Sequence, residues 1–160
     1  MGRVENNMQT YKHTQVGKFV AVLLGMLVVY EFCMMFFLFR TGELNMQSYL
    51  AITTSTSLIF VALLALFFSL TVEVNDQVLR LFFGVGLIRK SWRLSEIKSV
   101  QVVQNKWWYG LGIHLTPIGW VYNIGGLMAV EIEMKNGKKF RVGSDEAQML
   151  EMELKKHITT

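Results

Sequence analysis

The sequence predicts an α+β protein, in which a hairpin of two long helices precedes a domain of about seven β-strands that ends in one helix. Three observations support this fold class. Two apolar stretches lie close together near the start of the 160-residue chain. After Leu70 the hydrophobic period changes from helical to alternating, which indicates strands. An amphipathic helical pattern returns only after Ser144, near the end of the chain.

The two apolar stretches, 19–39 and 50–70, each contain 21 residues and are separated by a short polar segment. A helix needs about 20 apolar residues to cross the hydrocarbon core of a bilayer. So short a connection makes the two helices antiparallel neighbours. The first stretch is too long for the apolar region of a secretory signal, and no cleavage pattern follows it. We therefore expect a transmembrane helical hairpin, with the lipid bilayer as its first partner.

The charge distribution favours one orientation in the membrane. The formal charge is +4, and the chain before the first apolar stretch carries three cations against one acid. The chain after Leu70 carries twelve Lys and Arg against nine Asp and Glu. Because Lys and Arg beside short loops stay in the cytoplasm, we expect a plasma-membrane protein with both termini cytoplasmic. The expected parts are a cytoplasmic segment 1–18, the hairpin 19–70 and a β domain 71–160.

Glu31 interrupts the first apolar stretch near its middle, so a spanning helix must carry it at membrane depth. An ionised carboxylate in hydrocarbon is costly, and we expect Glu31 to be protonated or hydrogen-bonded. Candidate partners are hydroxyls of the run 53–57 on the second helix, with Thr54 and Ser57 foremost. Such a contact links helices or copies of the chain, or it forms part of a transport or proton-handling path. We favour the link, because two helices alone cannot enclose a path.

The first hairpin of the β domain is predicted around Asn75-Asp76, because apolar residues alternate on both sides of this turn-forming pair. This turn would pair Val72 with Leu79 and place apolar side chains on one face. The domain begins where the second apolar stretch ends, without a linker. Further strands are predicted over 87–93, 97–104 and 111–116, with a tight turn at 94–96.

A second hairpin is predicted over 128–143, around a three-residue loop with Gly137 in the left-handed conformation. This register separates apolar from charged side chains and places opposite charges directly across the ladder. The predicted pairs are Ile132 with Phe140 and Val130 with Val142 inside, and Glu131 with Arg141 and Glu133 with Lys139 outside.

The last helix is predicted to follow Ser144, which is a good N-cap residue. Asp145 and Glu146 suit the positive start of a helix, and the lysines near its end suit the negative end. The inward stripe is predicted to consist of Ala147, Leu150, Leu154 and Ile158.

The segment 107–126 gathers three of the four tryptophans and the only proline. Three interpretations remain open: core and turn material of the β domain, an interfacial anchor in which Lys106 and the aromatic side chains meet lipid headgroups, or a ligand or peptide groove. The candidate interface or groove residues are Trp107, Trp108, Tyr109, His114, Trp120, Tyr122 and Asn123.

The same segment carries a resemblance to a family. The motifs are Tyr109-Gly110-x-Gly112-Ile113, Gly119-Trp120-x-Tyr122-Asn123, Val130-Glu131-Ile132, Asn136-Gly137-Lys138 and Arg141-Val142-Gly143-Ser144-Asp145-Glu146. The chain resembles bacterial pleckstrin-homology-like (PH-like) domain membrane proteins, in which a two-helix anchor precedes the domain. The resemblance implies a PH-like seven-stranded barrel or sandwich capped by a C-terminal helix, with a role in binding or assembly. It brings no catalytic residues, and His114 stands where the family often has arginine.

The main basic cluster of the predicted domain consists of Arg89, Lys90 and Arg93. Facing the bilayer, each of these charges would contribute about 1 kcal/mol of attraction to an anionic leaflet. The alternative is an ordinary solvated strand face, and the sequence leaves both open. Eukaryotic PH domains that bind phosphoinositides use basic residues around the first hairpin loop. Here that loop is short and acidic, so that site is not expected.

No motif in the chain indicates catalysis. It has neither a phosphate-binding Gly-x-x-x-x-Gly-Lys loop nor a His-Glu-x-x-His zinc motif. Cys33 is the only cysteine, and the three histidines are scattered, so we expect no metal and no cofactor. The small positive excess of the domain does not suggest nucleic-acid binding.

We therefore expect a non-enzymatic, membrane-anchored binding or assembly module whose partner is a second copy or another membrane protein. The alternatives are an oligomeric transport or proton-handling protein that uses Glu31, and a lipid-sensing regulator of a neighbouring membrane protein.

Overall fold

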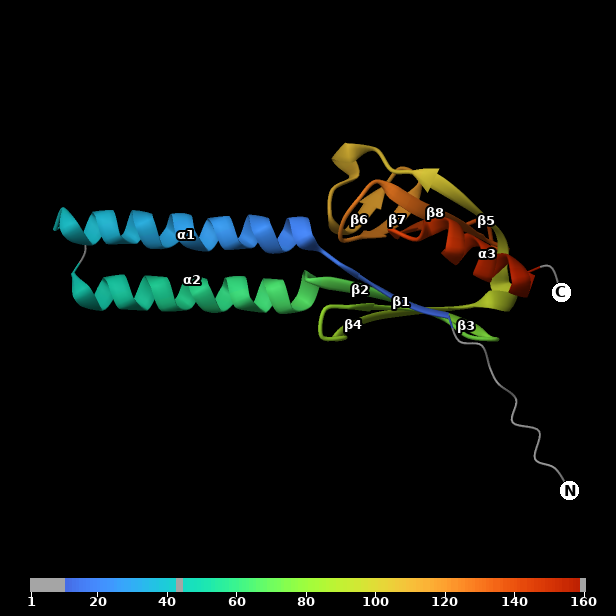
Figure 1. Ribbon diagram of the computed structural model, residues 1–160, viewed down its shortest axis with the longest axis horizontal. Coiled ribbons are helices and arrows are strands. Elements are labelled where there is room, and N and C mark those ends of the chain that lie inside the picture. Colours follow the sequence, from blue (N-terminus) through green and yellow to red (C-terminus); the bar gives the residue numbers. More distant parts are fainter. Residues whose placement is uncertain (1–10, 43–44, 159–160) are drawn as a thin grey trace, which may run out of the picture.

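The computed structural model describes residues 11–42 and 45–158 of the chain. Two long helices lie side by side and project from one end of a β domain (Figure 1). The predicted order of two long apolar helices, β-structure and a C-terminal helix is confirmed. The elements are β1 (Tyr11–Val16), α1 (Lys18–Arg40), α2 (Met46–Phe67), β2 (Ser69–Val74), β3 (Val78–Phe83), β4 (Ile88–Arg93), η1 (Leu94–Glu96), β5 (Ile97–Gln104), η2 (Trp107–Tyr109), β6 (Gly112–Thr116), β7 (Gly119–Asn123), β8 (Met128–Met134), β9 (Lys139–Gly143) and α3 (Ala147–Ile158).

The helices α1 and α2 differ slightly from the predicted apolar stretches. Helix α2 begins earlier than expected, because the Asn45 side chain accepts the Ser48 N–H at 2.8 Å and caps the first turn. It ends at Phe67, since strand β2 begins two residues later. At the far end of the hairpin, the rings of Phe39 and Tyr49 lie 5.5 Å apart, centroid to centroid.

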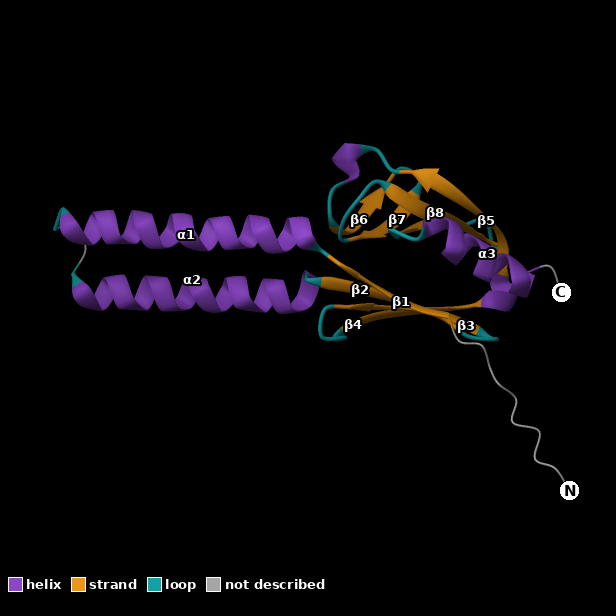
Figure 2. Cartoon of the chain, in the orientation of Figure 1, coloured by secondary structure: helices purple, strands orange, loops and turns teal. Residues whose placement is uncertain are grey.

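The strands form two sheets, in the orders β1-β2-β3-β4 and β5-β8-β9-β7-β6 (Figure 2). All neighbouring pairs are antiparallel except β7 and β9, which are parallel. The described strands close no barrel, so the sandwich alternative of the prediction describes them better. The described residues form nine strands instead of about seven, and the two that the sequence did not predict are β1 and β7.

Strand β1 lies in the stretch that the sequence assigns to a separate N-terminal segment. It pairs with β2 over its whole length, from Tyr11 opposite Val74 to Val16 opposite Ser69. The β domain is therefore built from chain on both sides of the helical hairpin.

Apolar side chains from both sheets meet in one core. Trp92 of β4 stacks on Phe140 of β9, with 4.2 Å between ring centroids, and Tyr122 packs against both rings. Helix α3 adds the predicted inward stripe, of which Ala147, Leu150 and Leu154 are fully buried and Ile158 is partly buried. Ser144 accepts the Glu146 N–H at 3.1 Å, and so forms a turn just ahead of α3 instead of capping its first residue.

The predicted register of the first hairpin is wrong by two residues. Val72 pairs with Leu81, and Leu79 pairs with Val74. The cause is Asn75, whose side-chain oxygen accepts the N–H groups of Gln77 at 3.2 Å and Val78 at 2.8 Å and moves the turn one residue onward. A shift of two keeps every side chain on its face, so the apolar residues still face the core.

The second hairpin has the predicted register, including both charged pairs and both apolar pairs. Gly137 has a φ of 81°, as the predicted left-handed position requires.

The helices join the β domain without a linker, as predicted. The Gly17 N–H donates to the Phe68 carbonyl at 2.7 Å, which ties the start of α1 to the end of α2. The Val85 N–H donates to the Ala65 carbonyl at 3.0 Å, which fastens the β3–β4 turn to the last turn of α2. A side chain at Gly84 would clash with that same carbonyl. The domain is thus held rigidly on the helices.

Strand β1 also contacts the start of α3. His13 Nε2 lies 2.7 Å from Asp145 Oδ1, and Nδ1 lies 3.2 Å from Glu146 Oε2. Burial and the nearby carboxylates of Glu146 and Asp145 raise the pKa of Tyr11 to about 12.

The Tyr11 phenol makes the fold sensitive to alkali. The folded chain holds this proton more tightly than the unfolded chain, whose tyrosine pKa is 10.0. The contribution of Tyr11 to stability is therefore fully present below pH 10.0 and should be lost as the pH rises towards about 12. Thermal unfolding of the full chain in detergent, followed by circular dichroism across this window, should show a smaller fall for Tyr11→Phe than for wild type. Equal falls would contradict the prediction.

Candidate functional site

The candidate site is the end of the β domain from which α1 and α2 emerge, here called the helix-proximal rim. It consists of the loops 84–87, 105–111 and 124–127 (Figure 1). The first loop is bonded to α2 through Val85. The other two line a shared groove together with Phe19 of α1. These three loops surround the base of the helical hairpin.

Large apolar side chains on the rim are exposed, although they adjoin a well-packed core. Leu87 is 76% exposed and Trp107 is 77% exposed. The Lys106 ammonium lies over the Trp108 ring, 5.1 Å from its centroid. Other exposed apolar side chains of the rim and the adjoining helix base are Phe19, Phe68, Val85, Trp108 and Leu127.

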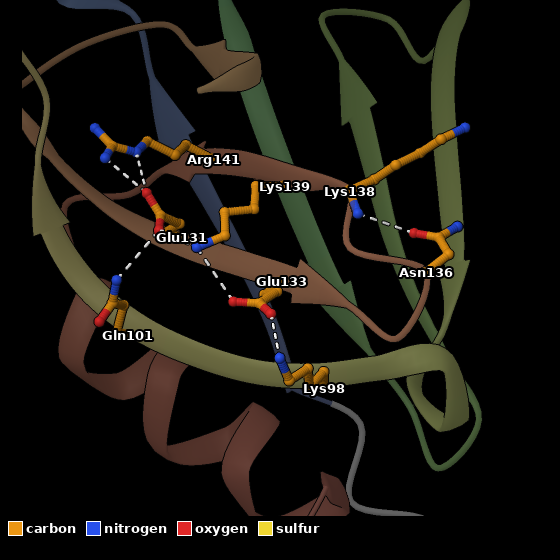
Figure 3. A network of polar contacts seen from close by, with 8 residues as sticks. All are labelled: Lys98, Gln101, Glu131, Glu133, Asn136, Lys138, Lys139 and Arg141. Atoms are coloured by element: carbon orange, nitrogen blue, oxygen red, sulfur yellow. Dashed lines mark hydrogen bonds and ion pairs between the residues drawn. The ribbon is translucent and has the colours of Figure 1, made fainter. Parts of the chain in front are cut away.

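A buried ion pair lies beside the loop 105–111. Arg141 donates to Glu131 Oε2 from Nε at 2.8 Å and from Nη2 at 2.6 Å (Figure 3). Arg141 Nη1 donates to Asn105 Oδ1 at 3.2 Å, and the guanidinium lies 6.0 Å from the Tyr109 ring centroid. The predicted pairing is correct, but Glu131 and Arg141 are buried, with only 7% and 9% of each residue exposed. These contacts connect the loop to the outer face of the five-stranded sheet.

The second charged pair is more open. Glu133 Oε1 accepts from Lys98 Nζ at 2.6 Å, and Glu133 Oε2 lies 3.2 Å from Lys139 Nζ (Figure 3). Hydrogen bonds from these two ammonium groups lower the pKa of Glu133. The arrangement is a surface ladder contact and not a catalytic acid pair.

The aromatic candidates do not form one groove. Trp107 and Trp108 are exposed on the rim, whereas Tyr109 lies against Arg141. Tyr122 belongs to the core, and Trp120 is half-exposed on the strand β7. Of the three interpretations, core material fits Tyr122 and an exposed anchor fits the tryptophans of the rim.

His114 and Asn123 have structural contacts. A ring nitrogen of His114 bonds to the Leu111 carbonyl, and His114 lines an apolar groove beside α1. Asn123 is buried and organises the loop that follows β7. Its Oδ1 accepts the Gly125 N–H at 3.1 Å, and its Nδ2 donates to the Gly126 carbonyl at 3.1 Å.

Two of the three basic candidates, Arg89 and Lys90, line one groove together with Arg80. Arg89 stands opposite Phe82 on the outer face of the sheet, next to the 84–87 loop. Lys90 stands opposite the buried Leu81, on the other face of the same edge strand. Arg93 is at the far end of β4, away from the helices. Only Arg89 is therefore close to the rim.

The polar contact between the helices involves Thr56. Its hydroxyl donates to Glu31 Oε1, while Thr54 is exposed on α2. Ser57 Oγ and Glu31 Oε2 are buried, and neither has a hydrogen-bond partner within 11–42 and 45–158. Glu31 thus links α1 to α2, as expected, but through a different hydroxyl from the foremost candidates.

Sequence reasoning missed Asn105, which connects the rim to the buried ion pair. Asn105 is only 4% exposed although it follows the edge strand β5 directly. No sequence signal marks it, because its burial depends on Arg141, which lies 36 residues further along the chain. Within the described part of the chain, no group of three or more His, Cys, Asp or Glu could hold a metal ion.

No family model, curated protein or solved structure matches this chain.

Removing one partner of the buried pair should be costly. Arg141→Ala leaves the buried Glu131 carboxylate with only the more distant Lys139 ammonium, 3.8 Å from Oε1, which should lower the free energy of unfolding by about 2–3 kcal/mol. The double replacement Glu131→Leu with Arg141→Met should recover most of this loss, because it leaves no unpaired charge. Denaturant unfolding of the full chain in detergent, followed by tryptophan fluorescence, measures the free energy of unfolding of the single and the double variant. Lys98→Ala, in the more open pair, should cost about 1 kcal/mol or less. Equal losses in the single and double variants would contradict the role of the pair.

Proposed function

We propose that the protein is a non-enzymatic, membrane-anchored binding module. The observation that carries this proposal is the exposed apolar surface of the two helices. Both helices are long and apolar enough to span a membrane. Helix α1 has no buried residue, and α2 buries only Thr53. With 23 and 22 residues, they match a hydrocarbon core of about 30 Å.

The rim supports this placement, because its chemistry suits the membrane surface. With the helices in the bilayer, the loops 84–87, 105–111 and 124–127 reach headgroup level. Tryptophan and lysine are favoured there, since each combines an apolar body with a polar end. The exposed Trp107 and Trp108 and the neighbouring Lys106 fit this environment. We assign the domain to the cytoplasmic side, with the end of α1 at Arg40 and the start of α2 at Met46 outside, from the charge distribution.

Binding is favoured over catalysis because the buried charges already serve the fold. Glu131 and Arg141 are satisfied by each other and by Asn105 and Gln101. We further propose a PH-like β domain, which is supported by the four-stranded antiparallel sheet, the second sheet and the C-terminal helix. The contact of Glu31 with Thr56 lies between helices of one chain, which favours an interhelical link over a transport path.

A partner surface is proposed at strand β6, which is an edge of the five-stranded sheet. Leu115 on β6 is 69% exposed and stands opposite the half-exposed Trp120 on β7. An edge strand has backbone N–H and C=O groups that are not paired within its sheet, and a second chain can form hydrogen bonds with them. The apolar pair of Leu115 and Trp120 would contact the side chains of that second chain. The edge strand β4 of the four-stranded sheet, by contrast, carries Arg89, Lys90 and Arg93, which discourage strand addition.

Cysteine labelling tests the anchoring. In a Cys33→Ser background, Thr41→Cys should react with a membrane-impermeant maleimide in intact cells, whereas Ser95→Cys should react only after permeabilisation. Labelling of both in intact cells, or release of the protein from membranes by urea, would contradict a spanning hairpin. The reverse pattern would keep the anchor and overturn the cytoplasmic orientation.

Crosslinking in native membranes tests the partner surface. The full chain should give a specific crosslinked complex, and Leu115→Glu should weaken it by about tenfold, because a charge at the centre of an apolar contact is strongly unfavourable. Met149→Glu changes a side chain of similar exposure on α3 and should leave the complex intact. A complex that resists Leu115→Glu, or the absence of any complex, would overturn the assignment to β6.

A further inference from the structure

We propose that two grooves that share Leu111 form one binding site for an anionic phospholipid. An acyl chain occupies the apolar groove, and the phosphate occupies the polar groove. This inference rests on the membrane anchoring proposed above, and it identifies a ligand for the rim.

The apolar groove lies where the helices meet the β domain. Its walls come from the first turns of α1, the last turns of α2 and the start of β6, and its volume is about 370 Å³. This volume falls in the range of about 300–1,000 Å³ that small-molecule clefts occupy. The principal lining residues are Leu23, Leu24, Leu63, Phe67, Leu111 and Ile113.

The polar groove shares Leu111 with the apolar groove and is named for Lys106 and Asn105, although most of its lining is apolar. Its volume is about 360 Å³, and Lys106, Asn105 and the backbone of Gly110 and Gly125 contribute to its walls. The lining of the polar groove therefore combines Lys106 and Asn105 with apolar side chains such as Phe19 and Trp107, a mixture that suits a phosphate and the apolar part of the lipid next to it.

Asn105 lines the polar groove and carries a buried donor. Its Oδ1 accepts from Arg141, which fixes the orientation of the amide and leaves Nδ2 as the free end. That Nδ2 atom is buried and has no hydrogen-bond partner among the described residues. A buried donor without a partner is costly, so an acceptor such as a phosphate oxygen would be stabilised there.

The charge around the polar groove favours an anion. Lys106 lines it, and no carboxylate in the described parts of the chain lies within ion-pair distance of its ammonium group. Phe19, in the first turn of α1, lines the same groove, so the positive end of the helix dipole adds to this preference. No side chain caps that helix end.

The position of the grooves favours a bilayer lipid over a soluble phosphate compound. The residues of α1 and α2 that line the apolar groove belong to the helix ends next to the domain. In the proposed placement these ends are at the boundary between hydrocarbon and headgroups. An acyl chain enters such a groove from the adjacent leaflet without crossing water.

Native mass spectrometry of the full chain in detergent micelles tests the site. Wild type should retain one phosphatidylglycerol per chain at concentrations where phosphatidylcholine is retained at least about tenfold less. Lys106→Glu should reduce phosphatidylglycerol binding by at least about tenfold, because it reverses the charge beside the phosphate. Leu63→Trp should reduce it similarly by filling the apolar groove.

Matched controls separate the site from general effects. Lys135→Glu makes the same charge change in the β8–β9 loop, and Val61→Trp adds the same ring to an exposed position of α2 outside the groove. Both should bind phosphatidylglycerol like wild type, and inorganic phosphate should not displace the lipid. Equal binding by all four variants, or displacement by inorganic phosphate, would overturn the proposal. The urea wash of membranes reports on anchoring separately, so its failure is distinguished from a failure of this site.

Discussion

The structure depends on one constraint: the helical hairpin replaces the turn between two neighbouring antiparallel strands. Strands β1 and β2 pair up to Val16 and Ser69, and the chain continues from that pair directly into α1 and out of α2. The hydrogen bond from Gly17 to Phe68 closes the junction. Because both strands lie in the same sheet, a motion of either helix must move the sheet. The domain is therefore an extension of the hairpin, and no flexible tether separates them.

A second, weaker set of contacts holds the loop 105–111 of the rim against the five-stranded sheet. The loop 105–111 leaves the edge strand β5, and it would have few contacts without the sheet beneath it. Asn105 and Tyr109 hold it there through Arg141, whose charge is balanced by Glu131. A buried ion pair adds little to stability compared with an apolar pair, but its fixed geometry positions the groups around it. In this protein the pair of Glu131 and Arg141 positions the loop 105–111, and with it the exposed tryptophans, next to the helices.

The sequence predicts local features of this fold well and tertiary ones poorly. The sequence predicts the register of the 128–143 hairpin correctly, because its turn, its apolar pattern and its charges all agree on one register. Strand β1 was missed because its inward positions carry Tyr11, His13 and Gln15, which give no apolar alternation. The first hairpin turn was misplaced because the bonds of Asn75 to Gln77 and Val78 N–H are a three-dimensional detail.

The same distinction applies to the candidate site. The sequence leaves open whether the aromatic segment is core, anchor or groove, and the structure divides its residues between rim, core and strand β7 according to which segments cover each of them. Asn105 illustrates how one buried side chain can serve both the fold and the proposed site. Its amide oxygen accepts from Arg141, and its amide nitrogen is buried without a hydrogen-bond partner among the described residues. Holding the loop and binding an anion use opposite ends of one side chain, so a ligand at this position adds a hydrogen bond without breaking one. In the proposed site, lipid binding and folding of the rim would therefore stabilise each other.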